Sequence, residues 1–306
     1  MSNITSSDNS ERESFQQFFE SWLVQQNRDL QDLIFASTNH KNTNTNHSKT
    51  EATPIADGQV SQMANGKVSK QLINQVIEHY EHYYKTKSRC VKQDVLAMLS
   101  PTWTTSLEDA FLWIGGWRPS MAFHLLYSKS GLEFEVRFNE IIHGLHSFDL
   151  ADLSLNQITK LDELQTKTIR EEREITEKMA KQQETVADSS MVELSHLMTE
   201  MIRDAGTGRN DSNGFEDRVD STLAPKEDEL EKILLRADDL RLRTLKSILN
   251  ILNPLQAAQF LIAAAELHLR LHDWGKKRDA RYDNRGISSL SNGGHATVDQ
   301  YGECNS

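Results

Sequence analysis

His268 and His272 are the two residues whose type and spacing best suit ligand chemistry in this sequence. With about 100° of rotation per helical residue, they share one helix face beside Ala264 and opposite Glu266 and Arg270. Imidazoles at this spacing can ligate a metal, and one alone can hold haem iron. His272 is nearer the predicted helix end, so we expect it closer to solvent and favour it as the iron ligand. The alternative interpretation is two neutral core histidines, and two ligands alone do not complete a zinc site.

A second candidate site lies in the aromatic segment between residues 103 and 127. Aromatic side chains at this density can line an apolar pocket or contact a partner, although they can equally form the core. Within a Gly-Gly-Trp-Arg-Pro turn, the arginine is expected to pair with Glu108 or Asp109. The candidate residues for a partner site or apolar pocket are Trp103, Trp113, Trp117 and Arg118.

No enzyme motif accompanies these candidates. The sequence lacks a G-x-S-x-G elbow, a Walker loop, an H-E-x-x-H pair and a dinucleotide-binding glycine fingerprint. We therefore predict a protein that is not an enzyme, with no catalytic residues and no metal beyond a haem iron at His268 or His272. A basic run follows the second histidine and indicates a nuclear import signal, a site for an acidic partner, or a solvated helix end. It comprises Lys276, Lys277, Arg278, Arg281 and Arg285.

Composition narrows the class of protein further. The 306 residues carry 34 Lys and Arg against 45 Asp and Glu, a net charge of −11, which argues against a primarily electrostatic nucleic-acid binder. Cys90 and Cys304, the two cysteines, exclude a disulfide scaffold and a cysteine zinc site. The polar N-terminus indicates no secretory signal, and no segment is apolar enough to predict a membrane span. The sequence thus predicts a protein of the nucleus or cytoplasm.

The elements that must position these residues are almost all helical, because apolar residues recur at three- and four-residue steps. Capping boxes are expected at Ser10, Thr105 and Ser154, and prolines at Pro225 and Pro254 are expected to open helices. No segment predicts a sheet. We predict one large all-α domain with long antiparallel helices over 11–274. A disordered N-terminus is expected at 1–10, a disordered linker at 37–66, a flexible loop at 205–224 and a disordered basic and polar tail at 275–306.

The segment Ser100–Ser120, with Leu107-Glu108-Asp109-Ala110-Phe111-Leu112-Trp113-Ile114-Gly115-Gly116-Trp117-Arg118-Pro119, resembles the central signature of the plant delay-of-germination domain. TGA-type bZIP transcription factors share this domain in their C-terminal half. The order of the other helical segments agrees, including Phe15 to Leu33 and Leu255 to Phe260. The resemblance covers about residues 11–274.

This resemblance implies a helical, non-enzymatic regulator of seed maturation, dormancy and abscisic-acid responses that acts through protein–protein interaction. It implies type 2C protein phosphatases as partners and haem as a cofactor, with His268 and His272 at the ligand positions. The TGA branch implies a homodimer and an apolar lipid-like ligand. The alternative is a TGA-like transcription factor that binds DNA sequence-specifically. Only about ten residues, with no basic run, precede the first predicted helix, so direct DNA binding is not expected.

Overall fold

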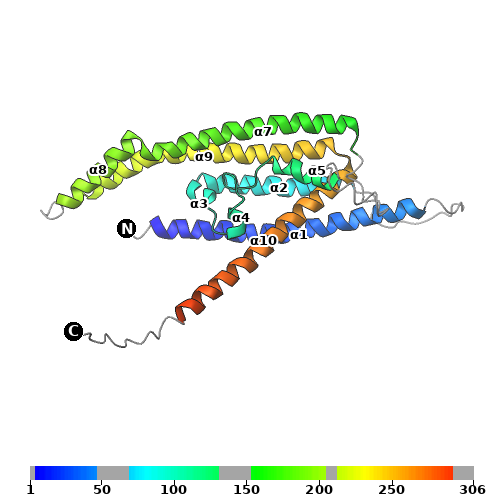
Figure 1. The fold of residues 1–306 in the computed structure, drawn as a ribbon, viewed down its shortest axis with the longest axis horizontal. Helices are drawn as coiled ribbons and strands as arrows, with labels where there is room; N and C mark the ends of the chain where they lie inside the picture. The colour runs from blue at the N-terminus through cyan, green and yellow to red at the C-terminus, as the bar shows by residue number, and fades with distance from the viewer. Residues whose placement is uncertain (1–3, 47–68, 131–152, 205–211, 292–306) are drawn as a thin grey trace, which may run out of the picture.

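The computed structural model describes residues 4–46, 69–130, 153–204 and 212–291, and this part of the chain contains helices and no strand (Figure 1). The all-α prediction is therefore confirmed. The elements are α1 (Ile4–Asn46), α2 (Lys70–Val91), α3 (Val95–Leu99), α4 (Ser106–Asp109), α5 (Met121–Ser130), α7 (Leu155–Glu184), the 3-10 turn η1 (Thr185–Ala187), α8 (Ser189–Asp204), α9 (Ser212–Ile251) and α10 (Pro254–Ser291).

The long helices lie in layers. Helices α7 and α9 run antiparallel along one side, α2 packs against α9, and α10 crosses α1 on the opposite side (Figure 1). The short helices α3, α4 and α5 lie between these layers, and α10 contacts both α4 and α5. The C-terminal part of α10 projects away from the body of the molecule.

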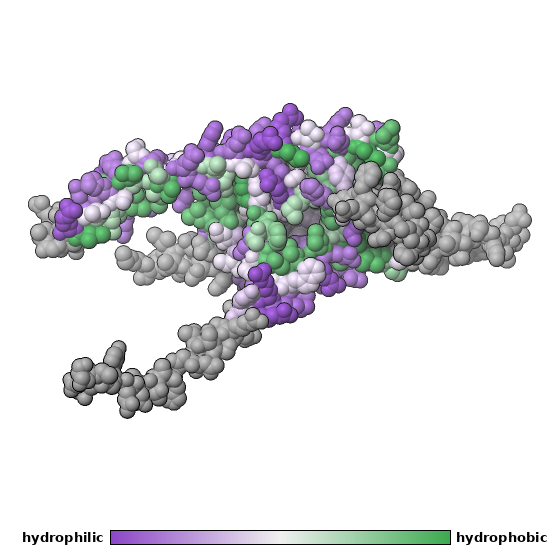
Figure 2. Space-filling model, in the orientation of Figure 1, coloured by the Kyte–Doolittle hydropathy of each residue, from purple (hydrophilic) through white to green (hydrophobic). Residues whose placement is uncertain are grey.

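The core joins these layers through apolar side chains that are fully excluded from solvent. Phe123 and Leu126 of α5 pack in one cluster with Leu161 of α7 and Ile248 of α9. Burying one such side chain stabilises the fold by about 1.5–3 kcal/mol. The outer face of α7 is hydrophilic, as its charged sequence predicts, whereas hydrophobic residues gather where α10 crosses the body (Figure 2).

Two of the predicted helix starts are confirmed with their capping boxes. The side chain of Thr105 accepts from the Glu108 backbone, and that of Glu108 accepts from the Thr105 backbone. Ser154 and Gln157 do the same at the start of α7. Each box satisfies orphan amides of a first helical turn, so it fixes where the helix begins. The start of α10 at Pro254 is also confirmed.

Several predicted boundaries were wrong because helices continue further than expected. Helix α1 begins at Ile4, so the helix does not start at Ser10 as predicted. It continues to Asn46 through the first part of the predicted linker. No proline or glycine interrupts this stretch. Helix α10 continues to Ser291 through most of the predicted tail. The predictions for 1–3, 47–66 and 292–306 lie outside the described residues.

The region around α8 also differs from the prediction. The helix expected from Ser154 to about residue 203 is interrupted at η1, and Asp188 then caps α8 by accepting from the Met191 amide at 3.0 Å. Helix α9 begins at Ser212, so 212–224 is not a loop and Pro225 lies inside a helix. A proline inside a helix removes one backbone hydrogen bond, and α9 packs against α8. Residues 205–211 lie outside the described part.

Within the described residues, no helix is both long enough and apolar enough to span a bilayer.

Candidate functional site

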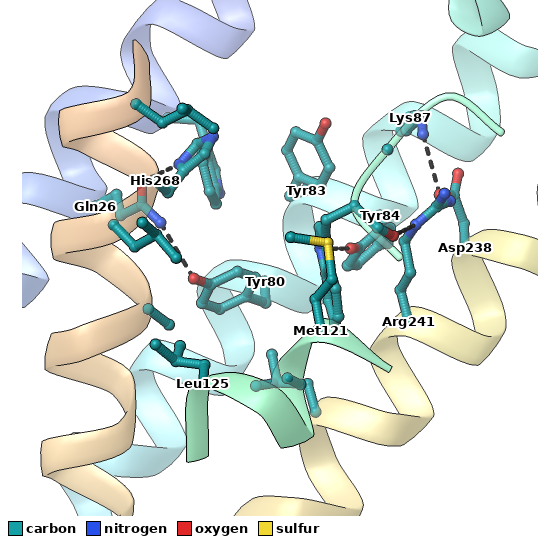
Figure 3. Close-up of a pocket in the computed structure, with 18 of the residues that line it drawn as sticks. Gln26, Tyr80, Tyr83, Tyr84, Lys87, Met121, Leu125, Asp238, Arg241 and His268 are labelled. Carbon is teal, nitrogen blue, oxygen red and sulfur yellow. Dashed lines mark hydrogen bonds and ion pairs between the residues drawn. The ribbon is translucent and has the colours of Figure 1, made fainter. Parts of the chain in front are cut away.

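A cavity of about 220 Å³ lies between α1, α2, α5, α9 and α10 (Figure 3). Its walls are mainly aromatic and aliphatic, because the apolar faces of these helices meet there without filling the space. Met121 and Leu125 of α5 border it on one side, and His268 of α10 lies on another. Tyr83 and Tyr84 of α2 also line it.

One wall of the cavity carries a buried group of charges. Lys87 Nζ lies 3.0 Å from Asp238 Oδ1 and donates to the Gly115 carbonyl at 2.6 Å. Arg241 NH1 donates to the same Asp238 oxygen at 2.5 Å, and the arginine side chain is fully buried. Burial lowers the pKa of Lys87 to about 8; Asp238 opposes this shift and Arg241 adds to it. We refer to Lys87, Asp238 and Arg241 as the charged wall.

The charged wall holds the Gly-Gly-Trp-Arg-Pro turn in place. Arg241 Nε donates to the Trp117 carbonyl at 2.7 Å, and NH2 donates to the Ile114 carbonyl at 2.9 Å and to the Trp113 carbonyl. Gly115 has a φ of 66°, and a Cβ there would lie 2.7 Å from a backbone oxygen, so glycine is required. Gly116 also has no room, since its Cβ would lie 2.9 Å from the guanidinium carbon.

The sequence predicted that Arg118 pairs with Glu108 or Asp109, and this prediction was wrong. Nε of Arg118 lies 3.0 Å from Oε2 of Glu172 on α7, and Glu172 also accepts from the Ser120 amide. Glu172 is buried on the apolar face of α7, where its position relative to Leu161 and Ile175 in the sequence could have indicated a core contact. Arg118 therefore attaches the turn to the α7 layer, which confirms neither a pocket nor a partner contact for this residue.

The three predicted tryptophans have different environments, and Trp117 is the one that lines the cavity. Its Nε1 donates to the Tyr84 hydroxyl at 3.0 Å. Trp113 lies under the Arg241 guanidinium, 5.2 Å from the ring centroid. Trp103 is buried against Phe15, with ring centroids 4.6 Å apart. Trp103 therefore belongs to the core and Trp113 to the turn, which agrees with the alternative that aromatic residues of this segment pack inside the protein.

His268 faces α1 and borders the cavity. Its Nδ1 lies 2.8 Å from Gln26 Oε1, and Gln26 Nε2 donates to the Tyr80 hydroxyl at 3.1 Å (Figure 3). Because this amide oxygen can only accept, Nδ1 carries the hydrogen and Nε2 keeps a lone pair. Burial lowers the pKa of His268 to about 4, an effect that Glu108 opposes and His272 reinforces, so the ring is neutral at pH 7.

His272 lies one turn further along and faces α4. Its Nδ1 lies 3.1 Å and 3.0 Å from the two carboxylate oxygens of Glu108, and its Nε2 is buried with no partner among the described residues. Burial disfavours the charged form of Glu108, but hydrogen bonds from His272 and Thr105 outweigh burial and lower the pKa of that carboxyl. His272 is more buried than His268, so the expectation that it lies closer to solvent was wrong.

The sequence reasoning missed Gln26 and all three residues of the charged wall. For two of them the signal was present, since Asp238 and Arg241 fall on the buried stripe of α9 with Ile233 and Ala237. Among the described residues, no group of three or more histidine, cysteine or acidic side chains could hold a metal ion. No side chain in this part of the chain is hydrogen-bonded to Nε2 of His272, so no nucleophile–base pair forms there.

Comparisons with known proteins match this chain to one family model and to several relatives. Residues 56–128 match the family model described as "DOG1: Seed dormancy control". Protein DOG1-like 4 of Arabidopsis thaliana is 31% identical over 87% of this chain and 94% of its own length. Protein RESPONSE TO ABA AND SALT 1 of the same plant is 25% identical over 88% and 98%. Transcription factor TGA6, also from Arabidopsis thaliana, is 26% identical over 82% of this chain and 60% of its own length.

Proposed function

The chain belongs to the DOG1 family of seed dormancy control, and from that premise we propose that it is a non-enzymatic regulator that acts by binding other proteins. We propose seed dormancy and abscisic-acid responses as the processes, type 2C protein phosphatases as partners, and the nucleus or cytoplasm as the location. The description of the family model, which mentions seed dormancy, and the names of two relatives, which mention ABA and transcription, support this proposal.

The observation that carries the binding role is an exposed stripe along α10. Leu267, Arg270, Trp274, Lys277 and Arg281 recur at three- and four-residue steps, so they share one helix face, and all are exposed to solvent. Trp274 is 55% exposed and Leu267 is 46% exposed. Tryptophan and arginine are enriched among the few residues that carry most of the binding energy at protein interfaces. We refer to these five residues as the α10 stripe.

The test is binding of a purified type 2C phosphatase by isothermal titration calorimetry. Trp274→Ala is expected to weaken binding at least tenfold, because truncation of a central aromatic commonly costs about 2 kcal/mol or more. Phe35→Ala is the matched control: this α1 side chain is 69% exposed, so its removal is equally harmless to the core. Equal binding by wild type and Trp274→Ala would refute a role for the α10 stripe.

Haem binding is a second candidate, favoured by the state of the two histidines. His268 holds its Nδ1 hydrogen on Gln26 and leaves Nε2 with a lone pair, the arrangement usual for metal-ligating histidine, and Nε2 of His272 has no partner among the described residues. The Nε2 atoms therefore suit axial ligation of a haem iron. The cavity of about 220 Å³ is below the about 300–1,000 Å³ of ordinary small-molecule sites, so haem would enter only as lining side chains move apart.

We propose His268 as the axial ligand, because it lines the cavity and His272 does not. Titration of haem into the protein is expected to give a Soret band that His268→Ala shifts or removes. His272→Ala is expected to have a smaller effect, and His124→Ala, an exposed position on α5, none. A spectrum that no histidine variant changes would leave both residues with purely structural roles.

The alternative, sequence-specific DNA binding, has less support from the charge of the chain. A net charge of −11 opposes approach to a phosphate backbone. In a gel-shift experiment at physiological salt, the protein is expected to bind a TGACG duplex no better than a scrambled one. A shift that disappears on scrambling would establish the alternative.

A further inference from the structure

The cavity is large enough for a compact organic molecule. An apolar cavity of about 150 Å³ can bind benzene. At about 220 Å³, this cavity has room for a ring with a short substituent, on the order of ten non-hydrogen atoms. Met121 and Leu267 line it and are 41% and 46% exposed, so an apolar entrance lies between α5 and α10.

The charged wall adds a polar end to this apolar space. Lys87 and Arg241 contribute two positive charges and Asp238 one negative charge, which leaves one excess positive charge in a buried place. Such a charge is costly unless an anion compensates it. Because the pKa of Lys87 is about 8, that charge is largely present at pH 7.

The hydrogen-bond inventory of the charged wall also has donors to spare. Lys87 has three N–H groups and uses two, on Gly115 and Asp238. Arg241 has five and uses four, on three backbone carbonyls and Asp238. Trp22 also lines the cavity, and its indole N–H has no partner among the described residues. Two acceptors of the cavity are left over among the described residues, Oδ2 of Asp238 and the lone pair on Nε2 of His268. The three spare donors of Lys87, Arg241 and Trp22 therefore outnumber the spare acceptors.

We propose that this cavity binds a compact organic anion: an apolar ring in the aromatic part and one carboxylate, or a group of equal charge, at Lys87 and Arg241. The apolar walls select the size of the ring, and the excess charge selects the sign of its substituent. This binding site does not depend on the proposed haem or phosphatase interactions.

Three probes of nearly equal shape test the proposal on the full chain by calorimetry: 3-phenylpropanoate, 3-phenylpropanamide and 3-phenylpropylamine. The anion is expected to bind at least tenfold more tightly than the neutral amide, and the amine least. Equal affinity of anion and amide, tighter binding of the amine, or binding of none of the three would overturn the proposal.

Two variants locate the site. Ala264→Phe is expected to abolish binding of the anion, because residue 264 lines the cavity and lies apart from the charged wall. Ala280→Phe places the same ring at an exposed position of α10 and is expected to change nothing. Lys87→Met is expected to bring the affinity for the anion down to that for the amide. Should Lys87→Met fail to fold, the first two variants decide the question, and anion binding that survives Ala264→Phe refutes this cavity as the site.

Discussion

Replacement of Arg241 by methionine tests the role of the charged wall in the fold. The change leaves the carbonyls of Trp113, Ile114 and Trp117 without their donor and leaves Asp238 with Lys87 alone. Asp238 keeps Lys87 as its partner, so no buried charge is left uncompensated and the cost comes chiefly from the three carbonyls. Each buried carbonyl left unpaired costs about 1–3 kcal/mol where water does not reach it. Water entering through the cavity can satisfy some of these groups, so we expect a loss of about 3 kcal/mol or more.

The measurement is urea unfolding followed by far-UV circular dichroism, with the slope of the transition checked for constancy. Arg243→Met is the matched control, two residues along the same helix. Its side chain is 44% exposed and pairs with Glu171 and Asp239, so its loss should cost less than about 1 kcal/mol. Arg241→Lys should fall between the two, since it keeps the charge and loses the planar fork. If Arg241→Met and Arg243→Met lose equal stability, the charged wall does not hold the turn.

Three further predictions concern other contacts. Gly275→Ala should lower the melting temperature by an amount that corresponds to about 1–3 kcal/mol, because the Cβ of the new alanine would lie 2.0 Å from Thr105 Oγ1. An unchanged melting temperature would contradict the close approach of α10 and α4. Trp113→Ala and Trp117→Ala should each lower the free energy of unfolding, measured in urea, by about 3 kcal/mol. This is the low end for removal of an aromatic side chain, because both rings are only partly buried. A loss of partner binding with an unchanged unfolding transition would instead place the two rings in an interface. Acidification should destabilise the protein, because the pKa of His268 is about 4 in the folded state and higher in the unfolded chain. The contribution of His268 to the free energy of unfolding is therefore complete above about pH 6.5 and falls by up to about 3 kcal/mol towards pH 4. Urea unfolding at pH 6.5, 5.5 and 4.5 should show this slope, and His268→Gln should flatten it.

The helical architecture could be predicted from the sequence because local signals specify it. The boxes at Thr105 and Ser154 satisfy amides three residues away, so their signal lies within one turn of the chain. Helix ends without such signals were misplaced: nothing in the composition of residues 37–46 or 275–291 shows that the preceding helix continues. Pro225 was misplaced in the opposite sense: proline normally opens a helix, but α9 already begins at Ser212.

The candidate site was harder to predict because its polar contacts join distant parts of the chain. The histidine pair and the tryptophan turn could be singled out by residue type. Their partners could not, since Gln26 and Glu172 lie 242 and 54 residues away from His268 and Arg118. Arg241 is a charged residue among leucines, and periodicity alone does not show that its charge is neutralised inside the core. Its place on the buried stripe of α9 could have singled it out, but the three carbonyls that it binds come together only in the fold.

The two imidazoles of α10 connect this helix to two different parts of the molecule. His268 is anchored to α1 through Gln26, and His272 is anchored to α4 through Glu108. Because the two rings are one turn apart on a rigid helix, α10 cannot turn about its axis without breaking both anchors together. Both anchors use Nδ1, so a molecule that takes Nε2 of either ring leaves the two anchors in place. The pair thus fixes the rotation of α10 at two points, and binding at an imidazole would not by itself release the helix.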